Sequence, residues 1–475
     1  MSEAVTRPGI TADALLASLD PLLRAWLPRQ RWFAGKGRPI TDFTLITATE
    51  LLPPTSELGL LHLLIQVRQP QVPGQVGGAP PLAADCYQLL LGVRRELPPR
   101  LAPALIGHVT QGPLAGFTVY EALHDARMSG FLLEALRMQA RVGKLRFERD
   151  RRKNIGEDLA PRVLATEQSN SSLVYGDTFI LKLFRRIVPG VNPDLELPLM
   201  LARERCAQVP APAAWFLADV GDEVNVLGVL QPYLKGTADG WELALRELAA
   251  DRDFSGEARA LGRATAEVHL ALARALPTVT LGRAQVELIA EGMADRLDAA
   301  AGAVPALLPY APALHTTFEA LADLGRGEAT WTAQRIHGDL HLGQCLRSPA
   351  GEWSLIDFEG EPSRLLSERR MPQPPVRDVA GMLRSFDYAA RSREPWAPKW
   401  AGDCRAAYCT GYAEVSGRDP RTDPVLLRAY ETDKAVYEVL YEARHRPDWL
   451  PVPLSAIKRL ATNGPATNGP VTDIH

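Results

Sequence analysis

Apolar positions follow one pattern in the front half of the chain and another in the back half. Between about residues 40 and 230, short apolar runs such as Gly59–Val67 and Cys86–Val93 have the length and composition of strands. From Gly236 to Leu324 the chain is rich in Ala and Leu, and the apolar positions of Glu257–Leu276 recur with helical spacing. A strand-rich front and a helix-rich back predict an α+β protein with two lobes, a plan suited to enclosing a ligand.

Three segments interrupt these patterns. Val72–Ala84 is rich in Pro and Gly, and we interpret it as a long hairpin loop inside an N-terminal module. Near Gln231-Pro232-Tyr233 a strand-like stretch gives way to helices. At the end, Ala461–Pro465 is repeated as Ala466–Pro470, and this Asn-Gly-Pro repeat predicts a disordered tail.

Composition narrows the classes of function. The formal net charge of -3 excludes a strongly basic protein built to bind nucleic acid. The 5 cysteines form no CxxC pair, as expected for reduced thiols. The start of the chain lacks the apolar core of a signal peptide, and no apolar run of about 18 residues occurs. We therefore expect a cytoplasmic protein without a membrane partner.

The segment from Arg335 to Gly360 contains the most informative chemistry. It reads RIHGDLHLGQCLR and then, after a short connection, WSLIDFEG, so that Asp339 and Asp357 each follow a short apolar run. A tight loop and a hairpin would bring both carboxylates together, as phosphoryl transfer requires. One carboxylate deprotonates the attacking hydroxyl, and the other holds Mg²⁺ on the phosphate oxygens. Gln344, on the loop of Asp339, could complete the metal shell with a neutral oxygen.

Two other interpretations of this segment were weighed. An isolated His-x-Asp pair often only stabilises a turn, but the second acidic motif at this spacing favours a catalytic site. His337 and His341 could instead ligate a metal with Asp339, as in a metal hydrolase. Mg²⁺ prefers oxygen ligands and no third imidazole lies nearby, so we expect these histidines to orient the loop.

The expected nucleotide side begins with a hairpin around Gly176-Asp177, whose second arm carries Lys182. A lysine inside an apolar strand is costly unless it is paired, and in a kinase its partners are the α- and β-phosphates of ATP and a glutamate of the next helix. Asn192 can cap that helix, and we expect Glu196, or secondarily Glu204, to pair with Lys182.

No GxGxxG motif precedes Lys182. We expect a turn of small polar residues to hold the phosphates through hydroxyls and backbone amides, and Leu230–Leu234 to pair with adenine. The residues in question are Ser169, Asn170, Ser171 and Ser172 for the phosphates, and Gln231 and Tyr233 for adenine.

The acceptor pocket is expected in the helical lobe. Sugars are bound by charged and amide groups that face their hydroxyls and by aromatic rings. Lys434 and Tyr437 are three positions apart on one predicted helix and therefore share a face. Further candidates are Asp433, Glu359, Glu361 and Arg444.

The HGDLHLGQ and IDFEGEP motifs resemble those of aminoglycoside-phosphotransferase-like kinases, in which HGDxHxxN precedes IDFE or IDWE. Gln344 stands where that broad family has Asn, and with this residue the match to the actinobacterial maltokinases is close. Leu27–Lys36, Val376–Ala390 and Thr432–Arg444 resemble that family as well. The resemblance implies that Asp339 is the catalytic base and contacts the substrate.

By the same resemblance, Asp357 is a Mg²⁺ ligand, and Lys434 and Tyr437 contact the sugar, with Glu359 as a further candidate for the sugar site. The implied fold is a bilobal protein-kinase-like fold with an N-terminal cap subdomain, a strand-rich N-lobe and a helical C-lobe. We place these parts at residues 1–110, 111–235 and 236–460, before the tail at 461–475.

The implied activity is ATP-dependent conversion of maltose to maltose 1-phosphate with Mg²⁺, in α-glucan and glycogen synthesis. Association with enzymes of the trehalose and α-glucan pathway is a further expectation. A kinase of the same build acting on glucosamine or an aminoglycoside is the nearest alternative. A nucleotide-binding regulator without turnover is an alternative of another class, although Lys182, Asp339 and Asp357 are all intact. The basic and aromatic cluster Arg29–Lys36 is expected to fasten the first helix to the following sheet.

Overall fold

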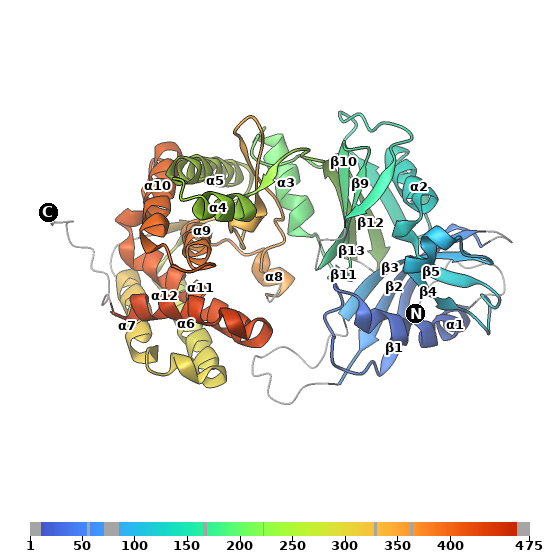
Figure 1. Ribbon diagram of the computed structural model, residues 1–475, viewed down its shortest axis with the longest axis horizontal. Coiled ribbons are helices and arrows are strands. Elements are labelled where there is room, and N and C mark those ends of the chain that lie inside the picture. The colour runs from blue at the N-terminus through green and yellow to red at the C-terminus, as the bar shows by residue number, and fades with distance from the viewer. Residues whose placement is uncertain are drawn as a thin grey trace. The chain divides into compact units, whose positions relative to one another are not determined.

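The computed structural model divides the chain into two compact units, Met1–Leu195 with Ala211–Lys235, and Glu196–Pro210 with Gly236–His475. Strands make up most of the first unit and helices most of the second (Figure 1). This agrees with the α+β class expected from the apolar pattern. The residues that the structure describes are 11–54, 58–70, 85–164, 169–221, 223–326, 330–361 and 364–462.

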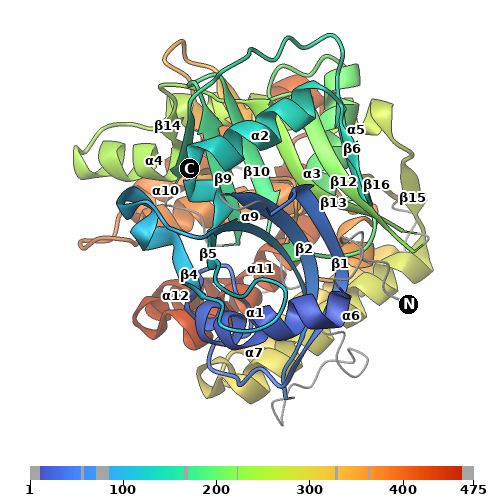
Figure 2. The ribbon, with the colours of Figure 1, turned by 90° about the vertical axis from the view of Figure 1, so that its right-hand side faces the viewer.

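Near the start of the first unit, helix α1 (Ala12–Trp26) packs on an antiparallel sheet (Figure 2). The strand order is β1-β2-β3-β5-β4, and β11 also pairs with β3. The strands are β1 (Asp42–Leu52), β2 (Gly59–Arg68), β3 (Asp85–Arg94), β4 (Leu105–His108), β5 (Thr118–Glu121) and β11 (Arg186–Ile187). Antiparallel pairing of β2 with β3 confirms the expected hairpin arms, whereas the expected loop Val72–Ala84 lies outside the described residues. The sheet continues to Glu121, beyond the cap boundary expected at residue 110.

Aromatic residues fasten the segment after α1 to this sheet, as predicted. The Trp32 and Tyr87 ring centroids are 5.9 Å apart, and those of Phe33 and Tyr87 are 5.2 Å apart. The Ala34 amide donates a hydrogen bond to the Tyr87 hydroxyl at 3.1 Å. Burying these rings removes a large apolar area from water and fixes the entry to β1.

A second antiparallel sheet completes the first unit, in the order β6-β7-β12-β13-β10-β9-β8, with helix α2 (Ala126–Arg137) packed against it. The strands are β6 (Arg141–Val142), β7 (Leu145–Arg149), β8 (Pro161–Leu164), β9 (Asn170–Tyr175), β10 (Phe179–Phe184), β12 (Ala214–Val220) and β13 (Glu223–Pro232). Tyr175 pairs with Phe179, so the predicted hairpin around Gly176-Asp177 is confirmed. This sheet carries Lys182 on a central strand.

Gln88 joins the two sheets from the middle of β3. Its amide nitrogen donates to the backbone oxygens of Phe184 and Leu227 at 2.8 and 2.9 Å, and its oxygen accepts from His62 Nε2 at 2.9 Å. All three contacts are buried, where an unmade hydrogen bond is expensive. Because Phe184 ends the strand that carries Lys182, the first sheet helps to fix the position of that strand.

The stability of the first unit should depend on the protonation of His62. Burial lowers the pKa of this fully buried imidazole from 6.5 to about 4. Below pH 6.5 the unfolded chain therefore binds a proton that the folded chain excludes, and the free energy of unfolding should fall by about 1.4 kcal/mol per pH unit towards pH 4. Urea unfolding of His62→Gln, which can still donate to Gln88, should show a shallower pH dependence than wild type. The same change at the half-exposed His315 should leave the slope unaltered, and equal slopes in all three proteins would contradict the assignment.

The second unit is a helical body with two small sheets, β14-β17-β18 and β15-β16. The predicted helix at Glu257–Leu276 is α5, which buries Leu261, Val268 and Leu272 against the core. Among the helices that the structure describes, none is long and apolar enough to cross a membrane. The helices are α4 (Gly240–Ala249), α5 (Ser255–Ala275), α6 (Arg283–Ala303), α7 (Ala311–Gly325), α8 (Leu366–Arg369), α9 (Val376–Ala389), α10 (Pro398–Ser416), α11 (Pro424–His445) and α12 (Pro451–Thr462), preceded by α3 (Pro193–Arg203), where the units meet in sequence. The strands are β14 (Ala238–Asp239), β15 (Val279–Leu281), β16 (Trp331–Ala333), β17 (Cys345–Arg347) and β18 (Trp353–Leu355).

Candidate active site

Lys182 is buried on β10 and pairs with an acid other than the predicted one. Its ammonium lies 2.8 Å from Asp194 Oδ2, and the two residues are only 9% and 7% exposed. The expected pairing with Glu196 is wrong, because Glu196 lies 2.8 Å from Arg335 and 3.1 Å from Arg370. Two positions along a helix correspond to a turn of about 200°, so Asp194 and Glu196 of α3 face opposite ways.

The start of α3 explains why Asp194 is so placed. The Asn192 side chain accepts a hydrogen bond from the Asp194 amide at 2.9 Å, which confirms Asn192 as the cap. The second-choice partner, Glu204, is also wrong for Lys182, since it pairs with Arg274 at 3.1 Å. Asp194 therefore supplies the ion-pair partner that a lysine buried in a strand requires.

The prediction of a phosphate-binding turn at Ser169–Ser172 is wrong as to secondary structure, because most of these residues form a strand. Asn170, Ser171 and Ser172 lie in β9, where Ser172 pairs with Lys182 across the ladder, and only Ser169 precedes the strand. Because β10 continues to Phe184, strand pairing extends over small polar residues that would otherwise favour a turn. The connection between β8 and β9, residues 165–168, lies outside the described residues.

The predicted adenine contacts lie at the end of β13. Gln231 pairs with Ile180 in the ladder. The Tyr233 amide donates to the Thr178 oxygen at 2.9 Å, and the Tyr233 oxygen accepts from the Lys235 amide at 2.9 Å. Both backbone groups of Tyr233 are therefore used within the chain. Gln231 and Tyr233 stay predictions as adenine contacts.

Hydrogen bonds join the loop between β16 and β17 to the turn after β18. His337 Nε2 lies 2.9 Å from the Ile356 oxygen, and the Ile356 amide donates to the Gln344 oxygen at 3.0 Å. The Gln344 side-chain amide donates to Asp357 Oδ2 at 3.3 Å. The loop that carries Asp339 and the turn that carries Asp357 thus form one structure.

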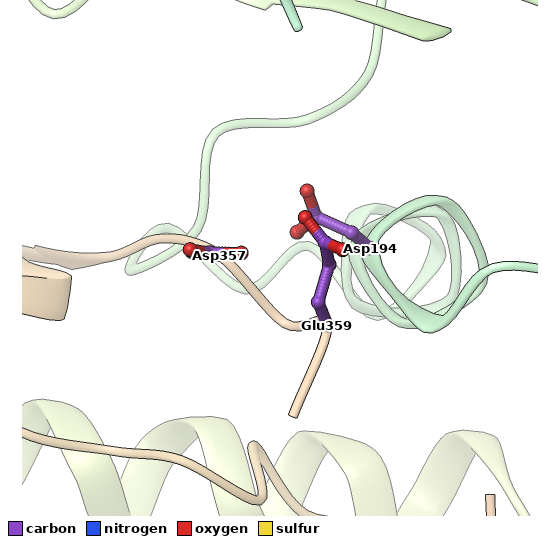
Figure 3. Close-up of side chains that lie close together, drawn as sticks. All are labelled: Asp194, Asp357 and Glu359. Atoms are coloured by element: carbon purple, nitrogen blue, oxygen red, sulfur yellow. The ribbon is translucent and has the colours of Figure 1, made fainter. Parts of the chain in front are cut away.

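Asp357 and Glu359 could together hold a cation. One oxygen of each lies within 4.8 Å of the other (Figure 3). Asp357 has a left-handed backbone with φ of 64°, which costs free energy for a non-glycine residue and is typical of functional positions. Carboxylate oxygens are the ligands that Mg²⁺ prefers. The donor set at this turn therefore fits a magnesium ion, with the Gln344 side chain holding Asp357.

Both histidines of the loop accept backbone hydrogen bonds from their own segment. His337 Nδ1 accepts from the Asp339 amide at 3.4 Å, so both of its ring nitrogens have partners within the chain. His341 Nδ1 accepts from the Gly343 amide at 3.1 Å. Burial lowers the pKa of His341, and the nearby Asp339 carboxylate offsets this effect only in part. The net shift favours the neutral ring. These contacts fit the loop-orienting role predicted for both residues.

Asp378 binds the backbone of the loop that carries Asp339 (called the catalytic loop for its proposed role), and the sequence did not reveal this contact. It is 1% exposed, and its oxygens accept from the amides of His337 at 2.8 Å and Gly338 at 2.9 Å and lie 3.0 Å from His269 Nε2. Burial alone would raise the pKa of Asp378, but these hydrogen bonds and the nearby imidazoles lower it. The available signal was an acid in the first turn of α9, a position that the helix dipole alone also favours for a carboxylate.

Helix α9 also approaches the loop closely at Gly381. A Cβ added there would lie 2.7 Å from the Leu340 oxygen, a distance that real Cβ atoms do not reach. The absent side chain lets the helix that carries Asp378 lie against the loop that carries Asp339. The sequence places these residues far apart, so packing creates this support.

Asp339 is held by a lysine of α11. Lys434 Nζ donates to Asp339 Oδ1 at 3.0 Å and to Glu361 Oε1 at 3.2 Å. Burial would lower the pKa of Lys434, yet the two carboxylates raise it far above its usual value. Glu361 is likewise buried, which would raise its pKa, but Lys434, Arg377 and Arg364 lower it to about 2. Lys434 therefore orients Asp339 and leaves Oδ2 of that carboxylate for another partner.

An aromatic face continues from Lys434 along α11. Lys434 Nζ lies 4.9 Å from the Tyr437 ring centroid, which confirms that these residues share a helix face. The rings of Tyr437 and Tyr441 are stacked with centroids 6.2 Å apart, and His445 follows 4.8 Å from Tyr441. We call Tyr437, Tyr441 and His445 the aromatic row. Of the other acceptor candidates, Asp433 pairs with Arg296 at 2.8 Å.

Comparisons with known proteins agree with this organisation. Residues 155–418 match the model described as phosphotransferase enzyme family, and residues 26–125 match that of the maltokinase N-terminal cap domain. The chain is 30% identical over 320 residues to a glucosamine kinase of Streptacidiphilus jiangxiensis, covering 62% of this chain and 71% of that protein. A glucosamine kinase of Mycolicibacterium smegmatis is 27% identical over 327 residues, covering 64% and 81%.

Solved structures show the same fold. A glucosamine kinase in complex with glucosamine, ADP and inorganic phosphate aligns with a TM-score of 0.64 at 23% identity, over 93% of this chain and 98% of that chain. Crystal form B of a glucosamine kinase aligns with a TM-score of 0.66, also at 23% identity and over the same shares of both chains. The predicted kinase-like fold with an N-terminal cap is therefore confirmed.

Proposed function

The chain belongs to the phosphotransferase enzyme family, and from this premise we propose that it transfers the γ-phosphate of ATP to a hydroxyl of maltose, producing maltose 1-phosphate. The observation that carries this proposal is the Asp339 carboxylate held by Lys434 at 3.0 Å, beside an aromatic face that suits a sugar. A sugar kinase needs a base with a fixed orientation next to a surface against which the sugar ring can pack.

Nucleotide and metal would be held by residues from the two described motifs. Lys182, paired with Asp194, would bind the α- and β-phosphates, and Asp357 with Glu359 would hold Mg²⁺. Gln344 holds Asp357 Oδ2, and its own oxygen remains suited to the metal shell. When bound, Mg·ATP supplies the phosphoryl group and the charge that neutralises its oxygens.

The chain's own contribution to the chemistry is proton removal and positioning. With Oδ1 of Asp339 bound by Lys434, Oδ2 would accept the proton of the acceptor hydroxyl. The Lys434 ammonium stays charged between Asp339 and Glu361, so it stabilises the carboxylate before transfer and the neighbouring negative charge during it. Asp378 keeps the loop backbone in place throughout.

Two features favour a neutral disaccharide over an amino sugar. All acids of α11 are committed to cations: Glu431 to Arg405, Asp433 to Arg296, Glu438 to Arg384 and Glu442 to Arg446. An ammonium group on the acceptor would have to compete with these ion pairs. In addition, the aromatic row offers stacked rings beyond Lys434, enough for a second sugar ring.

Glucosamine is the second candidate, because the sequence relatives described above are glucosamine kinases. A coupled assay of ADP release against maltose, glucose, glucosamine and an aminoglycoside decides between them. We expect kcat/KM to be highest with maltose. Removing the outer ring by Tyr441→Ala should lower kcat/KM for maltose by about tenfold, equivalent to about 1.4 kcal/mol, and leave glucose almost unaffected. A clear preference for glucosamine would overturn the maltose assignment, and absence of turnover on every acceptor would favour a regulator.

Asp357→Ala should weaken the binding of Mg·ATP and reduce turnover together. Loss of one charged ligand from a metal site should raise the Mg²⁺ concentration needed for half-maximal rate by about tenfold to a hundredfold. Titration of Mg²⁺ at fixed ATP measures this change. The surface variant Asp323→Ala is the matched control, and an unchanged magnesium requirement in Asp357→Ala would remove this residue from the metal site.

A further inference from the structure

A cavity of about 180 Å³ lies in the second unit, between the strand that precedes the catalytic loop and the helices packed around it. Its walls come from α5, β16, the start of α9, the end of α10 and the start of α11. The proposed nucleotide and acceptor residues are not among those that line it. Most of the wall is apolar, contributed by Leu270, Trp331, Val376, Val379 and Leu426.

The polar side of the cavity is joined to the catalytic loop. His269 and Tyr412 both line it, and His269 Nδ1 lies 2.9 Å from the Tyr412 hydroxyl. The other ring nitrogen of His269 lies 3.0 Å from Asp378, a hydrogen-bond acceptor that keeps a proton on Nε2. In the neutral tautomer Nδ1 accepts the hydrogen bond of Tyr412. An unbroken chain of hydrogen bonds therefore runs from the cavity wall through Asp378 to the amide of His337.

The charged groups at the rim compensate one another. Arg418 lies 3.8 Å from Asp423, and Arg421 binds Asp419 at 2.6 Å. A rim without excess charge gives no advantage to an ionic ligand, whose desolvation the apolar wall would leave uncompensated. Cavities of about 150 Å³ lined by apolar side chains bind a single benzene ring. Size and lining thus both indicate a small neutral ring compound.

We propose that this cavity is a second small-molecule site, which takes a neutral compound with one apolar ring and acts on the catalytic loop through Tyr412, His269 and Asp378. A ligand packed against Tyr412 and His269 restricts the side chains that hold Asp378. Asp378 in turn holds the amides of His337 and Gly338, so occupancy makes the loop more rigid around Asp339. Binding is independent of the proposed function, whereas its effect on turnover rests on that function.

The binding test uses phenol, a neutral single ring with one hydroxyl, and benzoate as its charged counterpart. Phenol in the low millimolar range should raise the melting temperature of the full chain in a saturable manner, and benzoate should not. Leu270→Trp, at a half-exposed position of the wall, should weaken phenol binding by about tenfold or more. Leu288→Trp places the same residue at an exposed leucine of α6 and should bind phenol like wild type. Equal stabilisation of both variants, or none in wild type, overturns the site.

The coupling test compares steady-state kinetics with and without phenol. Wild type should show a kcat raised by about twofold or more with little change in the KM for ATP, because the loop and not the nucleotide side is affected. Tyr412→Phe keeps the volume of the cavity but removes the donated hydrogen bond. It should still bind phenol, yet lose the change in kcat. Saturable binding to wild type without any change in kcat, or an unaltered response in Tyr412→Phe, overturns the coupling.

Discussion

Asp339→Asn should lower kcat by about a thousandfold or more while ATP binds almost as tightly as in wild type. The amide cannot take the proton of the acceptor hydroxyl, and general-base catalysis contributes about 10²- to 10⁴-fold. The substitution also removes the negative charge that lies 3.0 Å from Lys434 Nζ, so the ammonium retains its contact with the Glu361 carboxylate at 3.2 Å and loses the other. Coupled ADP release gives kcat, and isothermal titration with Mg·ATP gives the nucleotide affinity.

The control for this substitution is Asp323→Asn, which makes the same change in a surface ion pair with Arg326. Exposed pairs of this kind contribute little, so its kcat should match wild type. A loss of kcat in Asp339→Asn that is no larger than in the control would exclude Asp339 as the base. Parallel losses of kcat and nucleotide affinity would instead place Asp339 on the metal side.

Individual helices and strands could be predicted because each depends mainly on the residue pattern within its own segment. The hairpin that carries Lys182 was predictable from alternating apolar residues around Gly176-Asp177, and the pairing of Tyr175 with Phe179 has that register. Helix α5 followed in the same way from apolar spacing in an Ala-rich segment. Ser171 and Ser172 were wrongly predicted to form a turn, because their strand conformation comes from pairing with β10, which lies outside their own segment.

The site was predictable only as far as single motifs extend. Asp339, Gln344 and Asp357 lie in compact motifs whose residue types already indicate phosphoryl transfer. The choice between Asp194 and Glu196 depended on which way α3 faces, which the sequence leaves open because both acids suit a first helical turn. The bond from Lys434 to Asp339 joins α11 to the catalytic loop across 95 positions of sequence, and tertiary packing alone creates it.

Asp378→Asn should reduce both stability and turnover, although Asp378 lies outside the chemistry. At this site the carboxylate accepts hydrogen bonds from the His337 and Gly338 amides and faces His269 Nε2. The side-chain NH₂ group of the new Asn would therefore point at one of these donors and find no acceptor. A buried donor left without a partner costs about 1–3 kcal/mol, and a buried charge network that loses one partner costs about 3–5 kcal/mol. We therefore expect the free energy of unfolding, measured in urea, to fall by about 3 kcal/mol.

The kinetic part of this prediction separates a positioning role from a purely structural one. Well below the melting temperature Asp378→Asn remains folded, yet a loop displaced by about 1 Å should lower kcat about a hundredfold, with a much smaller effect on the KM for ATP. Hydrogen exchange at the His337 and Gly338 amides should accelerate at the same time, since their acceptor is lost. Asp403→Asn, in an exposed pair with Lys399, is the matched control and should change neither measurement. A destabilised Asp378→Asn that retains wild-type kcat would mean that the carboxylate supports the fold without setting the position of the catalytic loop.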